Sequence, residues 1–99
     1  MKSRKLESKF FTDSFIETLT LKQRYLFLYY LFNNRVNWLG CYEITDRHVI
    51  FECGNLITQK ELDEAKEIFV KNNKILFVDN YVILKNSEKY DNHIDNIQL

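Results

Sequence analysis

The feature that most constrains the fold lies near the end of the chain, where two apolar runs flank a polar pair. The runs are Ile75 to Val78 and Tyr81 to Leu84, and Asp79-Asn80 separates them. Two such runs around a two-residue turn predict a β-hairpin. A two-stranded hairpin is only marginally stable in water, so this one must pack against the upstream chain or against another molecule.

The upstream chain is predominantly helical in pattern. Thr12 or Asp13 can cap a short first helix at about 13–18, and Thr20 can cap a longer one over about 21–33. The best-marked helix covers about 58–72, where Thr58 and Glu61 match the capping box. In the 21–33 helix, apolar residues recur at helical spacing. They are Leu21, Tyr25, Leu28 and Phe32.

Two shorter elements are predicted between these helices. Gly40 permits a bend, and the alternation that follows it fits a short strand over 41–44. Thr45 or Asp46 can then cap a third helix that ends at Gly54, although helix and strand compete for the apolar run in it. Cys41 and Cys53 are too few for a disulfide framework, which favours reduced thiols.

The resulting order is helix, helix, strand, helix, helix, hairpin. This order predicts an α+β winged helix-turn-helix fold with four helices, in which the short strand near Tyr42 pairs with the hairpin, the wing. The length suits one domain, expected over 10–86 between a basic arm at 1–9 and a polar tail at 87–99.

Three stretches resemble a known family. "FFTDSFIETLTLKQRYLFLYYLFNN" is similar to an aromatic-rich opening followed by a core helix, and "GCYEI" to the start of a first strand. "NNKILFVDNYVILKNSEKY" resembles a wing and the segment that follows it. The family is the N-terminal winged-helix domain of phage replication initiators, the replisome organizers, and of DnaD-like primosome proteins. The resemblance implies work in helicase loading or at replication origins, through DNA binding, self-association or docking of other replication proteins.

Charge and motifs exclude several classes of function. Fourteen basic and fourteen acidic residues cancel, so no global field attracts the chain to nucleic acid or to an anionic membrane. No signal-peptide core or membrane-spanning run is present, which predicts a cytoplasmic protein without membrane contact. No phosphate-binding loop, metal-ligand cluster or catalytic constellation is found either. We therefore expect no enzymatic activity, small-molecule substrate, metal or cofactor.

The run "RYLFLYYLF" is apolar around the whole circumference of its predicted helix. Such a helix must be covered on several sides, either by its own domain or by a partner. Aromatic side chains are favoured interface anchors because they bury much area with few rotors. The residues predicted to bind a partner are Phe27, Tyr29, Tyr30 and Trp38.

DNA binding is the alternative. Winged helices commonly place the second helix of the helix-turn-helix in the major groove, but here its exposed face also carries Glu61, Asp63, Glu64 and Glu67. The residues that would bind DNA are Lys2, Arg4, Lys5, Lys9, Gln59, Lys60, Lys66, Lys74 and Lys85. A transcriptional regulator would share the fold but would need a dimer and paired half-sites.

The leading hypothesis is a non-catalytic assembly subunit of a phage or mobile-element replication system. Its expected partner is a helicase loader, a primase, a polymerase or a second copy of the chain.

Overall fold

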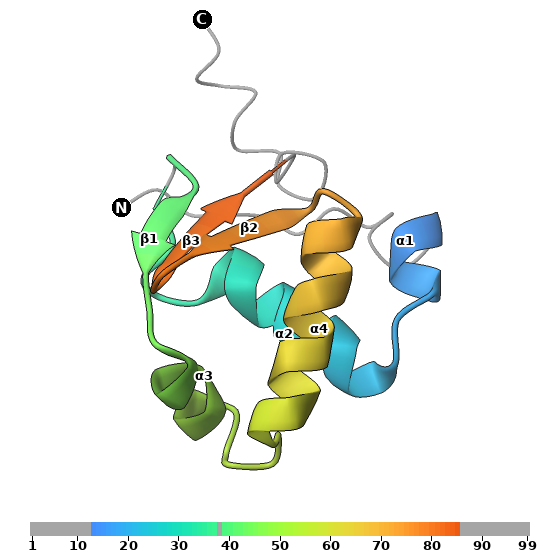
Figure 1. The fold of residues 1–99 in the computed structure, drawn as a ribbon, viewed down its shortest axis with the longest axis horizontal. Coiled ribbons are helices and arrows are strands. Elements are labelled where there is room, and N and C mark those ends of the chain that lie inside the picture. The colour runs from blue at the N-terminus through green and yellow to red at the C-terminus, as the bar shows by residue number, and fades with distance from the viewer. Residues whose placement is uncertain (1–12, 38, 86–99) are drawn as a thin grey trace, which may run out of the picture.

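A computed structural model describes residues 13–37 and 39–85 of the chain. Four helices and three strands follow one another in the predicted order (Figure 1). They are α1 (Ser14–Glu17), α2 (Leu21–Phe32), β1 (Cys41–Glu43), α3 (Asp46–Glu52), α4 (Gln59–Lys71), β2 (Ile75–Val78) and β3 (Tyr81–Leu84). The apolar run before Gly54, for which helix and strand were both possible, is the helix α3.

Each helix begins at a polar side chain that accepts a hydrogen bond from a backbone amide of the first turn. Asp13, Thr20, Thr45 and Thr58 fill this role. The capping box at Thr58 is confirmed, and α2 has a second one, in which the side-chain oxygen of Gln23 accepts a hydrogen bond from the Thr20 amide. The helix starts are thus fixed by local chemistry.

The three strands form one antiparallel sheet in the order β1-β3-β2. Val82 in the central strand lies opposite Tyr42 of β1 and Phe77 of β2. Gly40, with φ +74°, makes the bend that leads into β1. The hairpin is therefore supported in the predicted way, by a third strand and by the helices below it (Figure 1).

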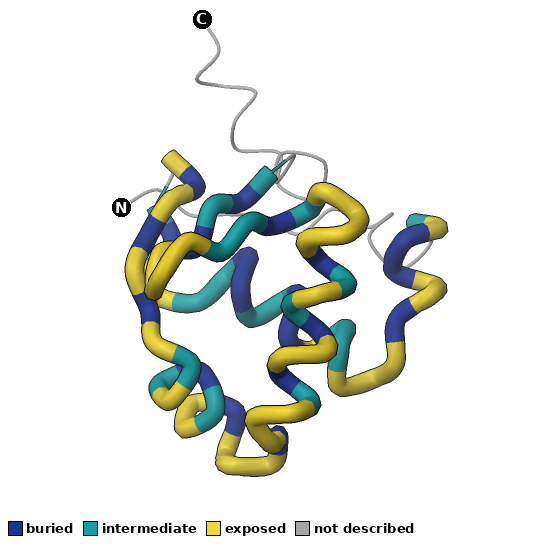
Figure 2. Tube along the Cα trace, viewed as in Figure 1, coloured by how far each residue is buried: buried dark blue, intermediate teal, exposed yellow. Residues whose placement is uncertain are grey.

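The core lies between the inner face of the sheet and helices α2 and α4 (Figure 2). At its centre the fully buried ring of Phe69 packs against Phe27, with ring centroids 5.2 Å apart, and against Tyr30 and Phe15, each at 6.4 Å. Phe77 extends this cluster from β2, with its ring 5.2 Å from that of Tyr30. Aromatic packing therefore joins α1, α2, α4 and the hairpin.

The buried face of α2 is not the set of apolar residues noted for their helical spacing. Leu26, Phe27, Tyr30 and Leu31 are its buried residues, whereas Leu21 is 83% exposed. Tyr25 is also exposed, and Leu28 and Phe32 pack only partly against the core. Helical spacing alone does not identify the inward face here, because a helix that is apolar all round has no polar side to fix which face turns inward.

A buried hydrogen bond connects α2 to the sheet. The Tyr42 hydroxyl of β1 donates to the carbonyl oxygen of Tyr30 at 2.7 Å and accepts from the Asn33 side chain at 2.9 Å. Carbonyls in the last turn of a helix have no partner within the helix. Tyr42 therefore satisfies an otherwise orphaned carbonyl while its ring packs in the core.

The chain thus has an α+β architecture with a small antiparallel sheet, an arrangement compatible with a winged helix. The predicted arm at 1–9 and tail at 87–99 lie outside the described residues. Within 13–37 and 39–85, no helix has both the length and the apolar character needed to cross a membrane.

Candidate functional site

The most prominent candidate site is an apolar surface on α2, α3 and the loop that follows α3. We call it the α2–α3 surface, and define it by Leu21, Tyr25, Phe51 and Leu56. These side chains are 83%, 52%, 67% and 76% exposed. Large apolar side chains that gather on one face of a small protein mark an interaction site more often than isolated ones do.

Local sequence explains why Phe51 points outward. Val49 and Cys53, four residues apart on one side of α3, are both buried. Because successive residues of a helix are about 100° apart, Phe51 between them falls on the opposite side. Gly54 then adopts φ +72°, as predicted for the residue after the helix, and the chain turns so that Leu56 is also exposed.

Two hollows meet at Tyr25 and make the α2–α3 surface continuous. One, of about 480 Å³, is lined mainly by apolar groups. Its lining residues are Leu21, Lys22, Tyr25, Cys53, Leu56 and Ile57. The other lies between Tyr25, Tyr29, Phe51 and Glu52 and is more polar. A partner could thus place an apolar side chain in the first hollow and find hydrogen-bonding groups in the second.

Polar contacts border this surface. The Tyr29 hydroxyl donates to Oε1 of Glu52, and Nε2 of His48 lies 3.3 Å from the same oxygen. Burial, reinforced by this hydrogen bond to Glu52, raises the pKa of Tyr29, so the hydroxyl stays a donor. Burial also raises the pKa of the Cys53 thiol, with a smaller effect from Glu52, which keeps the thiol neutral and weakly nucleophilic. The polar groups that border the α2–α3 surface are thus suited to hydrogen bonding with a bound partner.

The aromatic residues predicted to bind a partner do not form one exposed surface in the structure. Phe27 and Tyr30 are each only 1% exposed, so their assignment to a partner surface is corrected: they pack into the domain's own core. Tyr29 is partly buried and lines the polar hollow beside the α2–α3 surface. Trp38 lies outside the described residues.

Two of the residues predicted to contact DNA are engaged within the protein. Lys66 forms an ion pair with Asp46 at 2.8 Å, and Gln59 donates to the other oxygen of Asp46 at 3.0 Å. Both therefore hold α4 to the start of α3, which leaves them less free to reach a phosphate. Gln59 also donates to Asp63 at 2.9 Å.

The remaining predicted DNA contacts are dispersed. Lys60 is exposed on the first turn of α4. Lys74 lies over the ring of Phe15, 5.0 Å from its centroid, and its carbonyl accepts from the Lys85 amide at 2.8 Å. Lys74 and Lys85 thus flank the base of the hairpin rather than its tip. Lys2, Arg4, Lys5 and Lys9 lie outside the described residues.

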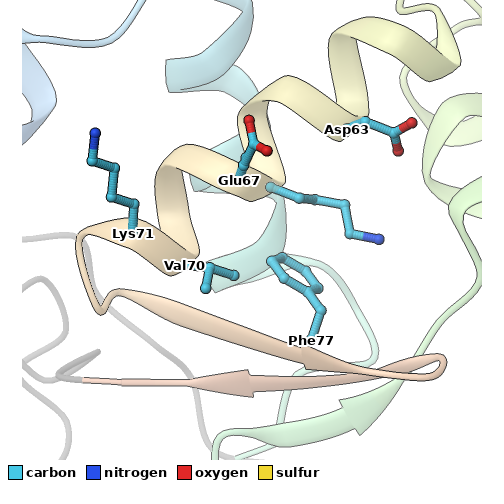
Figure 3. Close-up of a pocket in the computed structure, with 6 residues that line it drawn as sticks. Asp63, Glu67, Val70, Lys71 and Phe77 are labelled. Carbon is cyan, nitrogen blue, oxygen red and sulfur yellow. The ribbon is translucent and has the colours of Figure 1, made fainter.

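A second groove, of about 480 Å³, separates α4 from the hairpin (Figure 3). Asp63, Glu67, Val70 and Lys71 follow one another along α4, and Phe77 projects from β2 toward them. DNA binding through α4 stays a prediction. The carboxylates of Asp63 and Glu67 in this groove repel phosphate and therefore oppose it.

None of the four residues that define the α2–α3 surface was predicted to bind a partner; Leu21 and Tyr25 were noted only for their helical spacing, and Phe51 and Leu56 were not noted at all. The helical spacing of Val49 and Cys53 was the signal that could have identified Phe51. No comparable signal marks Leu56, because loop residues have no periodicity. Among the residues described, no group of three or more His, Cys, Asp or Glu side chains is placed to hold a metal ion.

Comparison with protein-family models, with curated proteins and with solved structures gave no match.

Proposed function

We propose that this chain is a non-catalytic winged-helix protein that assembles replication machinery by binding another protein. The observation that carries the proposal is the α2–α3 surface, where four large apolar side chains are exposed side by side. Fully burying one such side chain contributes about 1.5–3 kcal/mol. A partner that covers all four, which are 52–83% exposed, would gain about 4–8 kcal/mol toward the entropy cost of association, and contacts at the rim would add to it.

The charges near this surface agree with a protein partner. Lys22, at its edge, is already paired with Glu61 at 2.9 Å. His48 faces Glu52 on the other side. A surface with apolar contacts at its centre and polar groups and an ion pair at its rim has the usual anatomy of a protein–protein interface.

Assignment to replication rests on the resemblance of the opening, first-strand and wing segments to replisome organizers and DnaD-like primosome proteins. The expected partner is accordingly a helicase loader, a primase or a polymerase of a phage or mobile-element system, or a second copy of this chain. A cytoplasmic location follows from the same proposal.

The proposal is tested by binding measurements with purified partners. The full chain would be titrated by calorimetry with the helicase loader, primase and polymerase of the organism that encodes it, and its own mass followed by analytical ultracentrifugation. We expect at least one association, weakened more than tenfold by Phe51→Glu. Val78→Glu is the matched control, because Val78 is exposed on the hairpin and lines neither hollow of this surface. A monomer that binds none of these proteins would refute the proposal.

DNA binding is the second candidate, favoured by the succession of α3, α4 and a hairpin that is compatible with a winged helix. It would use Lys60 with the flanking Lys74 and Lys85. Mobility-shift titrations with single- and double-stranded DNA test it: phosphate contacts predict a shift at low salt that weakens steeply as salt rises. The absence of a shift at low salt would eliminate this candidate.

A further inference from the structure

The groove between α4 and the hairpin has a pattern of charge that the α2–α3 surface lacks. From the geometry we infer that it binds a peptide segment carrying an arginine or lysine close to an aliphatic side chain. This inference deepens the proposed function, since it rests on the chain being a protein-binding module and names the chemistry of a partner at a second face.

The floor of the groove is apolar. Val70 is 43% exposed, and Phe77 is only partly covered by its contact with Tyr30. Lys66 lies along one side, with its ammonium nitrogen 4.7 Å from the centroid of the Phe77 ring. An aliphatic side chain placed over Val70 and the exposed part of Phe77 beside it would remove that apolar area from water.

The acidic groups of the groove have no cation of their own in the described part of the chain. Asp63 and Glu67 are exposed, and neither forms an ion pair with a described residue. They stand four residues apart on α4, a spacing at which two like charges face each other and slightly destabilise the helix. A guanidinium or ammonium group between them would remove this repulsion.

The cations of the groove are less able to do so. Lys66 is held by Asp46, so its charge is already matched. Lys71 follows Glu67 by four residues but lies two turns along α4 from Asp63, at the opposite end of the groove (Figure 3). The groove is therefore negative at the Asp63 end and positive at the Lys71 end. This polarity sets the orientation of a bound peptide, with its cation toward Asp63 and Glu67.

Matched synthetic peptides test the inference by NMR titration of the isotope-labelled full chain. The probe has an arginine next but one to a leucine in a Gly-Ser background, and its three relatives carry Gln or Glu for the arginine, or Ser for the leucine. We expect the probe to shift the amide signals of Val70 and Phe77 and to bind more tightly than all three relatives. Its affinity should fall as salt is added, because exposed ion pairs are screened.

Variants on α4 locate the site. Asp63→Asn and Glu67→Gln should each weaken binding about two- to fivefold, the effect of losing one exposed ion pair. Glu64→Gln is the matched control, because Glu64 lies on the same helix but lines a different hollow beside Thr20 and Leu26. Val70→Asn should abolish binding, and it is preferred to a change at Phe77 because Val70 is more exposed than that core-packed ring.

Three results would overturn the inference. The Gln or Glu relatives could bind as tightly as the arginine probe, or no peptide could bind at all. A short DNA duplex could also shift the same signals and displace the probe. Failure of this inference can be told apart from failure of the proposed function. Phe51→Glu tests the α2–α3 surface and should leave peptide binding in the groove unchanged.

Discussion

Replacing Tyr42 by phenylalanine removes one oxygen atom from the core and tests how strongly α2 is held to the sheet. The ring and its packing are retained, so the change isolates the hydrogen bond to the Tyr30 carbonyl. That bond is buried, whereas the Asn33 side chain on the other side of the hydroxyl is only partly buried and can turn toward water. The loss therefore amounts to one buried acceptor without its donor.

An unsatisfied buried acceptor costs about 1–3 kcal/mol, so we expect Tyr42→Phe to lower the free energy of unfolding by about 2 kcal/mol. For a domain of this size, that loss corresponds to a fall in Tm of about 8–16 °C. Urea unfolding followed by circular dichroism would give the free energy, and calorimetry the Tm. Tyr81→Phe is the control, since Tyr81 is half exposed and its change should stay within about 0.5 kcal/mol.

A Tyr42→Phe protein as stable as the wild type would refute this reasoning. It would show that the Tyr30 carbonyl finds another donor, and that the bond contributes nothing net to stability.

Three further predictions follow from the core and the helix caps. Phe69→Ala should lower the free energy of unfolding by about 3–5 kcal/mol and leave much of the chain unfolded by circular dichroism, whereas Phe51→Ala at the exposed site should be nearly neutral. Similar losses of stability in the two variants would contradict the packing argument. Thr58→Ala should lower the free energy of unfolding by about 1 kcal/mol in urea titrations, because it uncaps α4, and an unchanged midpoint would show that the cap is dispensable. The hydrogen bond from Lys22 keeps the pKa of Glu61 below its usual range, so the ionised carboxylate stabilises the fold above the ordinary glutamate pKa, and this stabilisation is lost as pH falls through the lower folded-state pKa. Glu61→Gln can still complete the capping box and should therefore lose less stability than the wild type on acidification below about pH 5. Parallel curves of stability against pH for the two proteins would refute this.

The helix starts and the hairpin could be predicted because their causes are local. A threonine at 45 or 58 needs only the amide three residues further on to form its cap. The polar pair at Asp79-Asn80 needs only its flanking runs, and Asp79 does take the left-handed conformation, φ +56°, that suits such a turn. Helix caps and tight turns depend only on residues a few positions apart, so a short stretch of sequence is enough to predict them.

The orientation of α2 could not be predicted from the same kind of information. Every position from Tyr25 to Phe32 is apolar, so no contrast along the helix selects one face. The choice is made by Phe69 and Phe77, which come from elements far along the chain and contact Tyr30. These tertiary contacts accompany the burial of Phe27 and Tyr30, while Tyr25 stays exposed.

The candidate surface was only partly predictable for a related reason. An aromatic surplus drew attention to α2, but the exposed residues of the α2–α3 surface include Phe51 and Leu56 from the next helix and its loop. An interface assembled from separate segments is defined by their packing. Its members share no spacing in the sequence.

The central position of β3 has a consequence for how the chain matures. Tyr81 to Leu84 pairs on one side with β1, about forty residues earlier, and on the other with its neighbour β2. During synthesis, every helix and both outer strands emerge from the ribosome before the strand that joins them. Until then β1 has no hydrogen-bonding neighbour, and the inner side of Tyr42 has no sheet around it. We therefore expect chains truncated before residue 81 to be protease-sensitive, and chains that extend through residue 85 to be resistant.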